Sequence, residues 1–192
     1  MRHEMRIEGE NFRLRPVTIE DAAFIIELRT NLERTRLIHP ISPSVSDQER
    51  WLEQYFERSG DYYFIIEHNN TALPEGTIGI YDLDTTRMCA EWGRWIVRPG
   101  SIAAIESAVL IYKVAFTLLD LEMVYCRTPA ENARVVLFHK IFGLTSAVKL
   151  PAHFKLNGIA YDAIEQRMTR EVWQKSQAAW EAKASWVAKL RE

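Results

Sequence analysis

The stretch CAEWGRWIVRPGSIAAIESAVLIYKVAFTLL, residues 89–119, decides the fold. Its first nine residues, Cys89–Val97, include two tryptophans, an isoleucine and a valine and predict a strand. Pro99 and Gly100 end the strand, because proline lacks a backbone donor and the pair favours a turn. Ile102–Leu119 then has the length and apolar periodicity of a substantial helix. A strand, a break and a long apolar helix predict a helix connected to a sheet.

The segments on either side extend this mixture of strands and helices. Before it we expect a strand at residues 12–15 that ends at Pro16, a helix that begins at Thr18 and Asp21, a helix from near Ser46, and strands at Tyr62–Glu67 and Gly76–Leu83. After it we expect a strand at Met123–Thr128, a helix at Asn132–Phe142 closed by Gly143, a hairpin over Ala147–Met168 that turns at Asn157–Gly158, and a helix from about Arg170. The order predicts an α/β fold.

Length and composition predict one globular domain. The chain has 192 residues, is 47% apolar and 26% charged, and contains no apolar run long enough to span a bilayer. Its formal net charge of -2 offers no general attraction for nucleic acid. Residues 1–10 lack the apolar core of a secretory signal, so we expect a cytoplasmic protein. Cys89 and Cys126 are far apart and predict neither a disulfide framework nor a metal site.

Several segments together resemble the GNAT superfamily, in particular its ribosomal-protein N-terminal and amino-sugar (nucleotide-sugar) acetyltransferases. The resemblance runs from about Phe12 to Trp173 and is carried by FRLRPVTIEDA, AEWGRWIV with the loop and helix that follow, ENARVVLFHKIFGL, and LPAHFKLNGIAYDAIEQRMTREVW. It implies a central mixed, mostly antiparallel sheet with splayed fourth and fifth strands, flanking helices and an extra C-terminal helix. Residues 1–173 would form the acetyltransferase domain and residues 174–192 a helical extension.

The resemblance implies acetyl-CoA as co-substrate. In the family, the pantetheine arm pairs with the exposed edge of the fourth strand, and backbone N–H groups at the start of the next helix face the pyrophosphate. The corresponding residues are Ile96, Val97, Ser101, Ile102, Ala103, Ala104 and Ile105. Asn132 stands where the family contacts the pantetheine amide, and it is equally suited to cap its helix.

The pyrophosphate loop departs from the family pattern at three positions. The family has a basic or amide residue followed by two small residues, usually glycines, and this chain has Ser101, Ala104 and Glu106 there. A carboxylate near a pyrophosphate would repel it. We therefore expect weakened acetyl-CoA binding, a Glu106 side chain turned away from the phosphates, and stronger binding after Glu106→Gly.

Glu91 is the first catalytic candidate. Several relatives carry a carboxylate at this strand position, and it accepts the proton of the attacking amine. Regular strand alternation would place four residues on one face: Glu91, Gly93, Trp95 and Val97. The alternative is a glutamate that pairs with an arginine or faces solvent.

His139 is the second candidate, because many relatives have a tyrosine there that protonates the leaving thiolate. An imidazole titrates near neutrality and could act as acid or base. The alternative is a histidine that only packs beside Val135, Val136 and Phe142. His39 and His153 lie in segments that border the acceptor pocket of relatives and are weaker candidates.

The leading hypothesis is an N-acetyltransferase for the primary amine of a small molecule, an amino sugar or nucleotide-linked amino sugar. The alternatives are protein N-terminal acetylation and a non-catalytic acyl-CoA-binding domain. The last helix could contact its own domain or a second copy of the chain in a homodimer. The stripe that would make this contact is Val172, Ala179, Ala182, Trp186 and Leu190.

Overall fold

One sheet organises the computed structural model, which describes residues 2–31, 35–144 and 146–189. Eight described strands lie in the order β1-β2-β3-β4-β5-β6-β8-β7. The strands are β1 (Ile7–Glu8), β2 (Phe12–Pro16), β3 (Tyr62–His68), β4 (Pro74–Asp84), β5 (Cys89–Val97), β6 (Met123–Pro129), β7 (Ser146–Leu156) and β8 (Ile159–Thr169). The helices are α1 (Ala22–Arg29), α3 (Val45–Phe56), α4 (Ala103–Lys113), α5 (Ala133–Ile141) and α6 (Arg170–Lys189).

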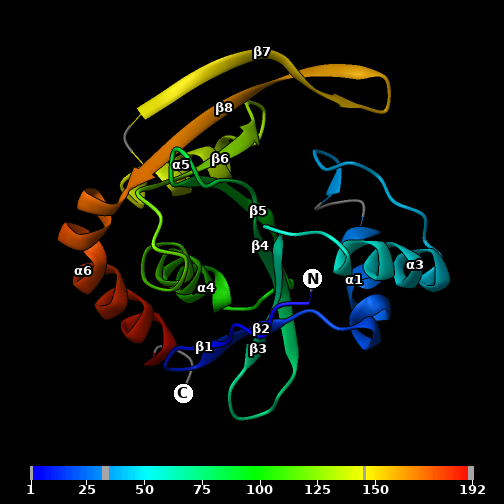
Figure 1. Ribbon diagram of the computed structural model, residues 1–192, viewed down its shortest axis with the longest axis horizontal. Coiled ribbons are helices and arrows are strands. Elements are labelled where there is room, and N and C mark those ends of the chain that lie inside the picture. The colour runs from blue at the N-terminus through cyan, green and yellow to red at the C-terminus, as the bar shows by residue number, and fades with distance from the viewer. Residues whose placement is uncertain (1, 32–34, 145, 190–192) are drawn as a thin grey trace.

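Helices cover both faces of the sheet, with α4 and α6 on one side and α1 and α3 on the other (Figure 1). All paired strands are antiparallel except β5 and β6, which are parallel. The fold class predicted from the sequence is therefore confirmed, with splayed strands that correspond to β5 and β6. One strand was missed, because the charged β1 has only two residues and depends on its antiparallel pairing with β2.

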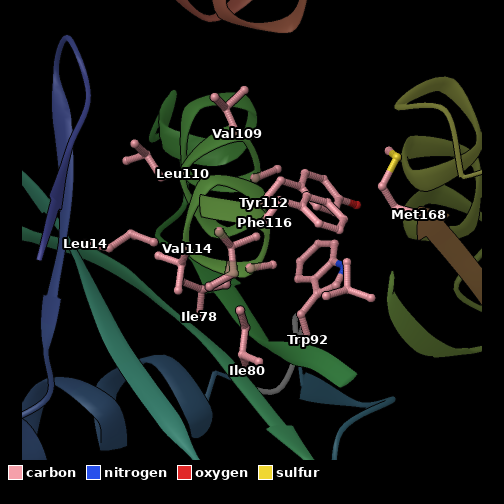
Figure 2. Packing of buried hydrophobic residues seen from close by; sticks show 14 of the residues in the cluster. Leu14, Ile78, Ile80, Trp92, Val109, Leu110, Tyr112, Val114, Phe116 and Met168 are labelled. Atoms are coloured by element: carbon pink, nitrogen blue, oxygen red, sulfur yellow. The ribbon is translucent and has the colours of Figure 1, made fainter. Parts of the chain in front are cut away.

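The main core lies between the sheet and α4, as Figure 2 shows. Leu14 of β2 and Ile78 of β4 are fully buried beneath α4, together with Trp92 of β5. Tyr112 of α4 lies edge-on to Trp92, with 5.6 Å between the ring centroids. Burial of these large apolar side chains holds α4 on the sheet. It stabilises the fold by about 25 cal/mol for each Å² of apolar surface removed from water.

Local sequence explains the ends of several elements. The Ser44 side chain accepts a hydrogen bond from the Asp47 backbone N–H at the start of α3. The β7–β8 turn has positive φ angles at Asn157 (50°) and Gly158 (81°), which asparagine and glycine tolerate. The predicted long helix Ile102–Leu119 is α4 followed by a π-helical turn at Val114–Leu118.

Helix α6 packs against its own domain. Trp180 stacks on Phe142, with ring centroids 3.8 Å apart, and Glu181 pairs with Lys113 of α4 at 2.6 Å. The stripe predicted from the sequence is not the face that packs on this domain: Ala179 and Ala182 are exposed, and Trp186 is 60% exposed. Contact of that stripe with a second copy of the chain stays a prediction. The buried face consists of Trp173, Trp180, Ala184 and Ala188, with Trp180 partly buried. Leu190, also part of that stripe, lies outside the described residues.

Candidate active site

A cleft opens where β5 and β6 separate. Their parallel ladder has only three residue pairs, from Cys89 and Met123 to Glu91 and Tyr125. Beyond it lies a cavity of about 200 Å³. Its lining comes from both sides of the sheet: Arg29, Leu37, Ile38 and His39; Trp92 to Ile96 of β5; Cys126 to Pro129 of β6; Asn132, Val135 and His139 around α5; and Phe154 and Leu156 of β7.

A bulge at Arg94 determines which β5 side chains face each helix layer. Gly93 pairs with Gly79 of β4, but Ile96 pairs with Thr77, so β5 has one extra residue between these pairs. Arg94 is that residue, and its φ angle is +50°. The regular alternation predicted from the sequence is therefore wrong: Trp95 lies on the α4 side, where its indole N–H donates to Ser107, and not with Glu91.

The bulge is held by ionic and aromatic contacts. The Arg94 guanidinium pairs with Asp61, with 2.8 Å between Nη2 and Oδ2, and lies 4.6 Å from the centre of the Tyr81 ring. The Thr77 hydroxyl donates to the Arg94 carbonyl at 2.8 Å. A positive φ at a residue other than glycine is strained, so these contacts stabilise the bulge against regular pairing.

Glu91 is buried beside the cleft but does not line it. Its carboxylate accepts from Arg127 at 2.9 Å and from the Tyr81 hydroxyl at 3.4 Å. Burial raises the pKa of Glu91 to about 7, although the charge of Arg127 acts in the opposite direction. A Cβ at Gly93 would lie 2.4 Å from the Tyr81 hydroxyl oxygen, so this hydroxyl is close to the cleft wall. Glu91 thus has the protonation equilibrium of a base near neutrality.

His139 lines the cleft from α5 and is only 2% exposed. Its ring stands edge-on to Trp92, with centroids 5.0 Å apart, and Nδ1 is buried without a hydrogen-bond partner among the described residues. Burial lowers the pKa of His139 to about 4. The imidazole is therefore neutral at pH 7 and can donate or accept a hydrogen bond there.

Three arginines line the cleft. Arg29 comes from the end of α1, Arg94 from the bulge and Arg127 from β6. The exposed His39 also lines the cleft, and its carbonyl accepts from Arg29 Nη2 at 2.7 Å. His153 is exposed on β7 and does not line the cleft.

The sequence model of the acetyltransferase (GNAT) domain matches residues 11–145. The chain belongs to the GNAT acetyltransferase family. A nucleotide-linked sugar GNAT, FdhC in its apo form, is 26% identical, with a TM-score of 0.77 over 93% of this chain and 97% of its own. A spermidine N-acetyltransferase from Vibrio cholerae, in complex with CoA and spermine, is 20% identical, with a TM-score of 0.76 over 85% of this chain and 98% of its own. At that identity the second likeness shows the fold alone. No curated protein matches this GNAT chain.

Acetyl-CoA is the co-substrate of this family, and the structure separates the residues predicted to bind it into two regions. Ile96 and Asn132 line the cleft. The Asn132 side chain also accepts from the Val135 N–H at 3.4 Å, as expected of a helix cap. Ser101 and Ile102 line a second cavity of about 530 Å³ near the start of α4. Val97 and the residues Ala103, Ala104 and Ile105 line neither cavity, and Ala103 is fully buried.

Glu106 has a structural role in this GNAT domain. Its carboxylate is buried and accepts from the backbone N–H groups of Asn11 and Phe12, at 3.0 and 3.3 Å. Burial raises its pKa, while these hydrogen bonds act in the opposite direction. Removing the carboxylate would leave both N–H groups without this acceptor. The structure therefore predicts a loss of stability for Glu106→Gly, and the gain in affinity expected from the sequence stays a prediction.

The start of α4 fits a phosphate group through its backbone. The N-cap residue is Ile102, whose side chain makes no capping hydrogen bond. The Ser101 hydroxyl accepts from the Ala103 N–H at 3.2 Å. The next N–H groups have no acceptor within the helix, because an α-helix leaves its first donors free. The nearby Arg98 side chain pairs with Glu27 at 2.8 Å. The backbone of this GNAT loop is thus a better fit for phosphate than its side chains.

None of the three arginines that line the cleft was a site candidate from the sequence. Arg29 ends a helix and Arg127 interrupts an apolar strand, and both patterns are common on ordinary surfaces. The signal available in the sequence was that Arg127 lies within Met123–Thr128, one of the two strands predicted to splay. No cluster of side chains suited to a metal ion is found in residues 2–31, 35–144 and 146–189, and no helix in these ranges combines the length and apolarity needed to cross a bilayer.

Proposed function

We propose that this acetyltransferase transfers the acetyl group of acetyl-CoA to a primary amine on an amino sugar or nucleotide-linked amino sugar. The observation that carries the proposal is the cleft between β5 and β6, which connects the α4 side of the sheet with the α1 side. An amine on one side would attack the thioester carbonyl on the other, so that the amide bond forms, the C–S bond breaks and CoA leaves as its thiolate, without a covalent enzyme intermediate. The likeness to the nucleotide-linked sugar GNAT supports the choice of acceptor.

Acetyl-CoA supplies the activated acyl group, and the residues of the chain must orient the amine and remove its proton. We assign the proton acceptor to Glu91, whose pKa of about 7 leaves it half ionised at neutral pH. The Tyr81 hydroxyl, which donates to Glu91 and lies against Gly93, gives a route from the cleft to the carboxylate. His139 provides a neutral polar group on the α4 side.

The first test is calorimetric titration of acetyl-CoA into the purified chain, followed by thiol release and acyl transfer with a panel of amines. We expect acetyl-CoA to bind and an amino sugar or its nucleotide derivative to be acetylated. Binding to the native state alone would also raise the melting temperature. No response to millimolar acetyl-CoA in either binding assay would contradict the proposal.

The same panel separates the alternative functions. Transfer to the N-terminus of peptides, but not to amino sugars, would indicate protein N-terminal acetylation. Binding of acetyl-CoA without transfer to any amine would indicate a non-catalytic acyl-CoA-binding domain, an alternative favoured by the altered loop at Ser101 and Ala104.

We also propose that acetyl-CoA contacts Ile96, Val97, Asn132 and residues 101–105. Calorimetric titration of acetyl-CoA into single variants at these positions would map the contacts.

A further inference from the structure

Arg29 is the cleft arginine for which the described residues supply no ion-pair partner. Its Nη2 donates to the carbonyl of His39 at 2.7 Å, but its Nε is buried without a hydrogen-bond partner among the described residues. No described carboxylate lies within ion-pair distance of Arg29, whereas Arg94 pairs with Asp61 at 2.8 Å. Arg29 therefore differs from a structural arginine, which normally has an acidic partner when it is removed from water.

Arg127 of β6 also differs from Arg29, because it has acidic partners. Its guanidinium pairs with Glu91 at 2.9 Å and with Glu165 at 3.0 Å. Arg94 and Arg127 thus have acidic partners, whereas Arg29 has none among the described residues. Burial lowers the pKa of Arg29, and the like charge of Arg94 acts in the same direction. A partly buried guanidinium of this kind is stabilised when an anion approaches it.

The other described residues of the cleft lining add no negative charge. The lining contains three arginines and two histidines, and no aspartate or glutamate among the described residues. A polycationic acceptor would meet like charges here, because two cations in a poorly solvated cleft repel each other. An acceptor with an anionic group would instead supply the partner that Arg29 lacks.

We infer that Arg29 binds an anionic group of the amine acceptor, a phosphate or a carboxylate, and so selects acidic acceptors over neutral amines and polyamines. This inference rests on the proposed acetyl transfer. Arg29 is suited to the task because a guanidinium presents several donors in one plane, and phosphate and carboxylate oxygens match that geometry. The hydrogen bond to His39 uses Nη2 and holds the side chain at the cleft wall.

The test compares acceptors that share an amine and differ in charge: glucosamine, glucosamine 1-phosphate, glucosaminic acid and spermidine. We expect kcat/KM to be at least about tenfold higher for the phosphate or the carboxylate compound than for glucosamine, and lowest for spermidine. In Arg29→Gln, KM for the preferred anionic acceptor should rise by about 10- to 100-fold while kcat and the KM for acetyl-CoA stay close to wild type. Comparison of kcat/KM for glucosamine 1-phosphate and for glucosaminic acid decides whether the bound group is a phosphate or a carboxylate.

Two variants control this experiment. Arg29→Lys keeps the charge but loses the planar donors, and should restore part of the preference. Arg50→Gln removes an exposed arginine of α3 outside the cleft and should behave as wild type. Melting temperatures of all three variants report whether the fold is intact. If Arg29→Gln does not fold, the preference of Arg29→Lys for anionic acceptors decides the result. A preference weaker than that of wild type supports the inference, and an unchanged preference contradicts it.

Calorimetric titration with glucosamine 1-phosphate and with UDP separates this inference from the proposed function. If no amine is acetylated but either anion binds wild type at least tenfold more tightly than Arg29→Gln, the proposed function fails and the anion site stands. If amines are acetylated without regard to charge, or if Arg29→Gln keeps the wild-type preference, the anion site is wrong while the acetyltransferase stands. A preference of the wild type for spermidine would also overturn the inference.

Discussion

His139→Phe tests whether the α5 histidine is held neutral in the core. Phenylalanine has a similar size and can keep the edge-on contact with Trp92, but it has no group that must be charged or hydrogen-bonded. The folded protein lowers the pKa of His139 from 6.5 to about 4. The native state therefore binds fewer protons than the unfolded chain between these values, so stability is lost as the pH falls through this window.

The size of the effect follows from the two pKa values. The full shift corresponds to about 3 kcal/mol, of which about 2 kcal/mol is lost between pH 7.5 and pH 5. Wild type should lose this amount beyond whatever His139→Phe loses over the same range. For a chain of this length, the difference equals about 4–8 °C in melting temperature.

Urea unfolding of both proteins at pH 7.5 and pH 5 measures the difference, because the titration of all other groups cancels between them. His153→Phe, at an exposed histidine, is the matched control and should follow wild type. Parallel pH dependence of wild type and His139→Phe would refute the reasoning, because it would show that His139 takes up its proton in the folded state as easily as in the unfolded chain.

Four further substitutions test the site and its support. Glu91→Gln should lower kcat by about two to four orders of magnitude with little change in acetyl-CoA affinity, and remove the rise in rate as the pH increases towards 7; an unchanged pH–rate profile would exclude Glu91 as the base. Glu106→Gln should lower the free energy of unfolding by about 1–3 kcal/mol, measured by urea denaturation, because the amide is a weaker acceptor for two backbone N–H groups; wild-type stability would contradict the assigned role. Trp180→Ala should cost about 3 kcal/mol through loss of the stack on Phe142, whereas Trp186→Ala should cost less than about 0.5 kcal/mol; equal costs in thermal or urea unfolding would show that α6 does not pack as described.

The sequence by itself determined the order of strands and helices from β2 to α6, because each pattern depends on neighbours along the chain. The apolar periodicity of Ile102–Leu119 predicts a helix in any globular context, and Asn157–Gly158 favours a tight turn wherever two strands flank it. The family resemblance supplied the position of the cleft, between Cys89–Val97 and the strand at Met123–Thr128. These features need no knowledge of which side chains meet across the sheet.

Tertiary structure decided which faces the side chains occupy. The bulge at Arg94 reverses the alternation of β5, and it exists because Asp61 and Tyr81, from other strands and loops, hold that arginine. The buried face of α6 differs from the predicted stripe because Trp180 finds its partner in Phe142. Such contacts depend on packing between distant segments, which the periodicity of one segment does not specify.

The chemistry of the cleft was likewise decided by tertiary structure. Arg29 and Arg127 are far apart in the sequence, and only the fold brings both to the lining of the cleft. The sequence predicts only that Glu106 turns away from the phosphates, and the fold supplies its partners, two backbone N–H groups of the N-terminal hairpin that donate to its carboxylate. The charge of each residue is fixed by its type, but its effect on a ligand depends on which charges and donors the fold places beside it.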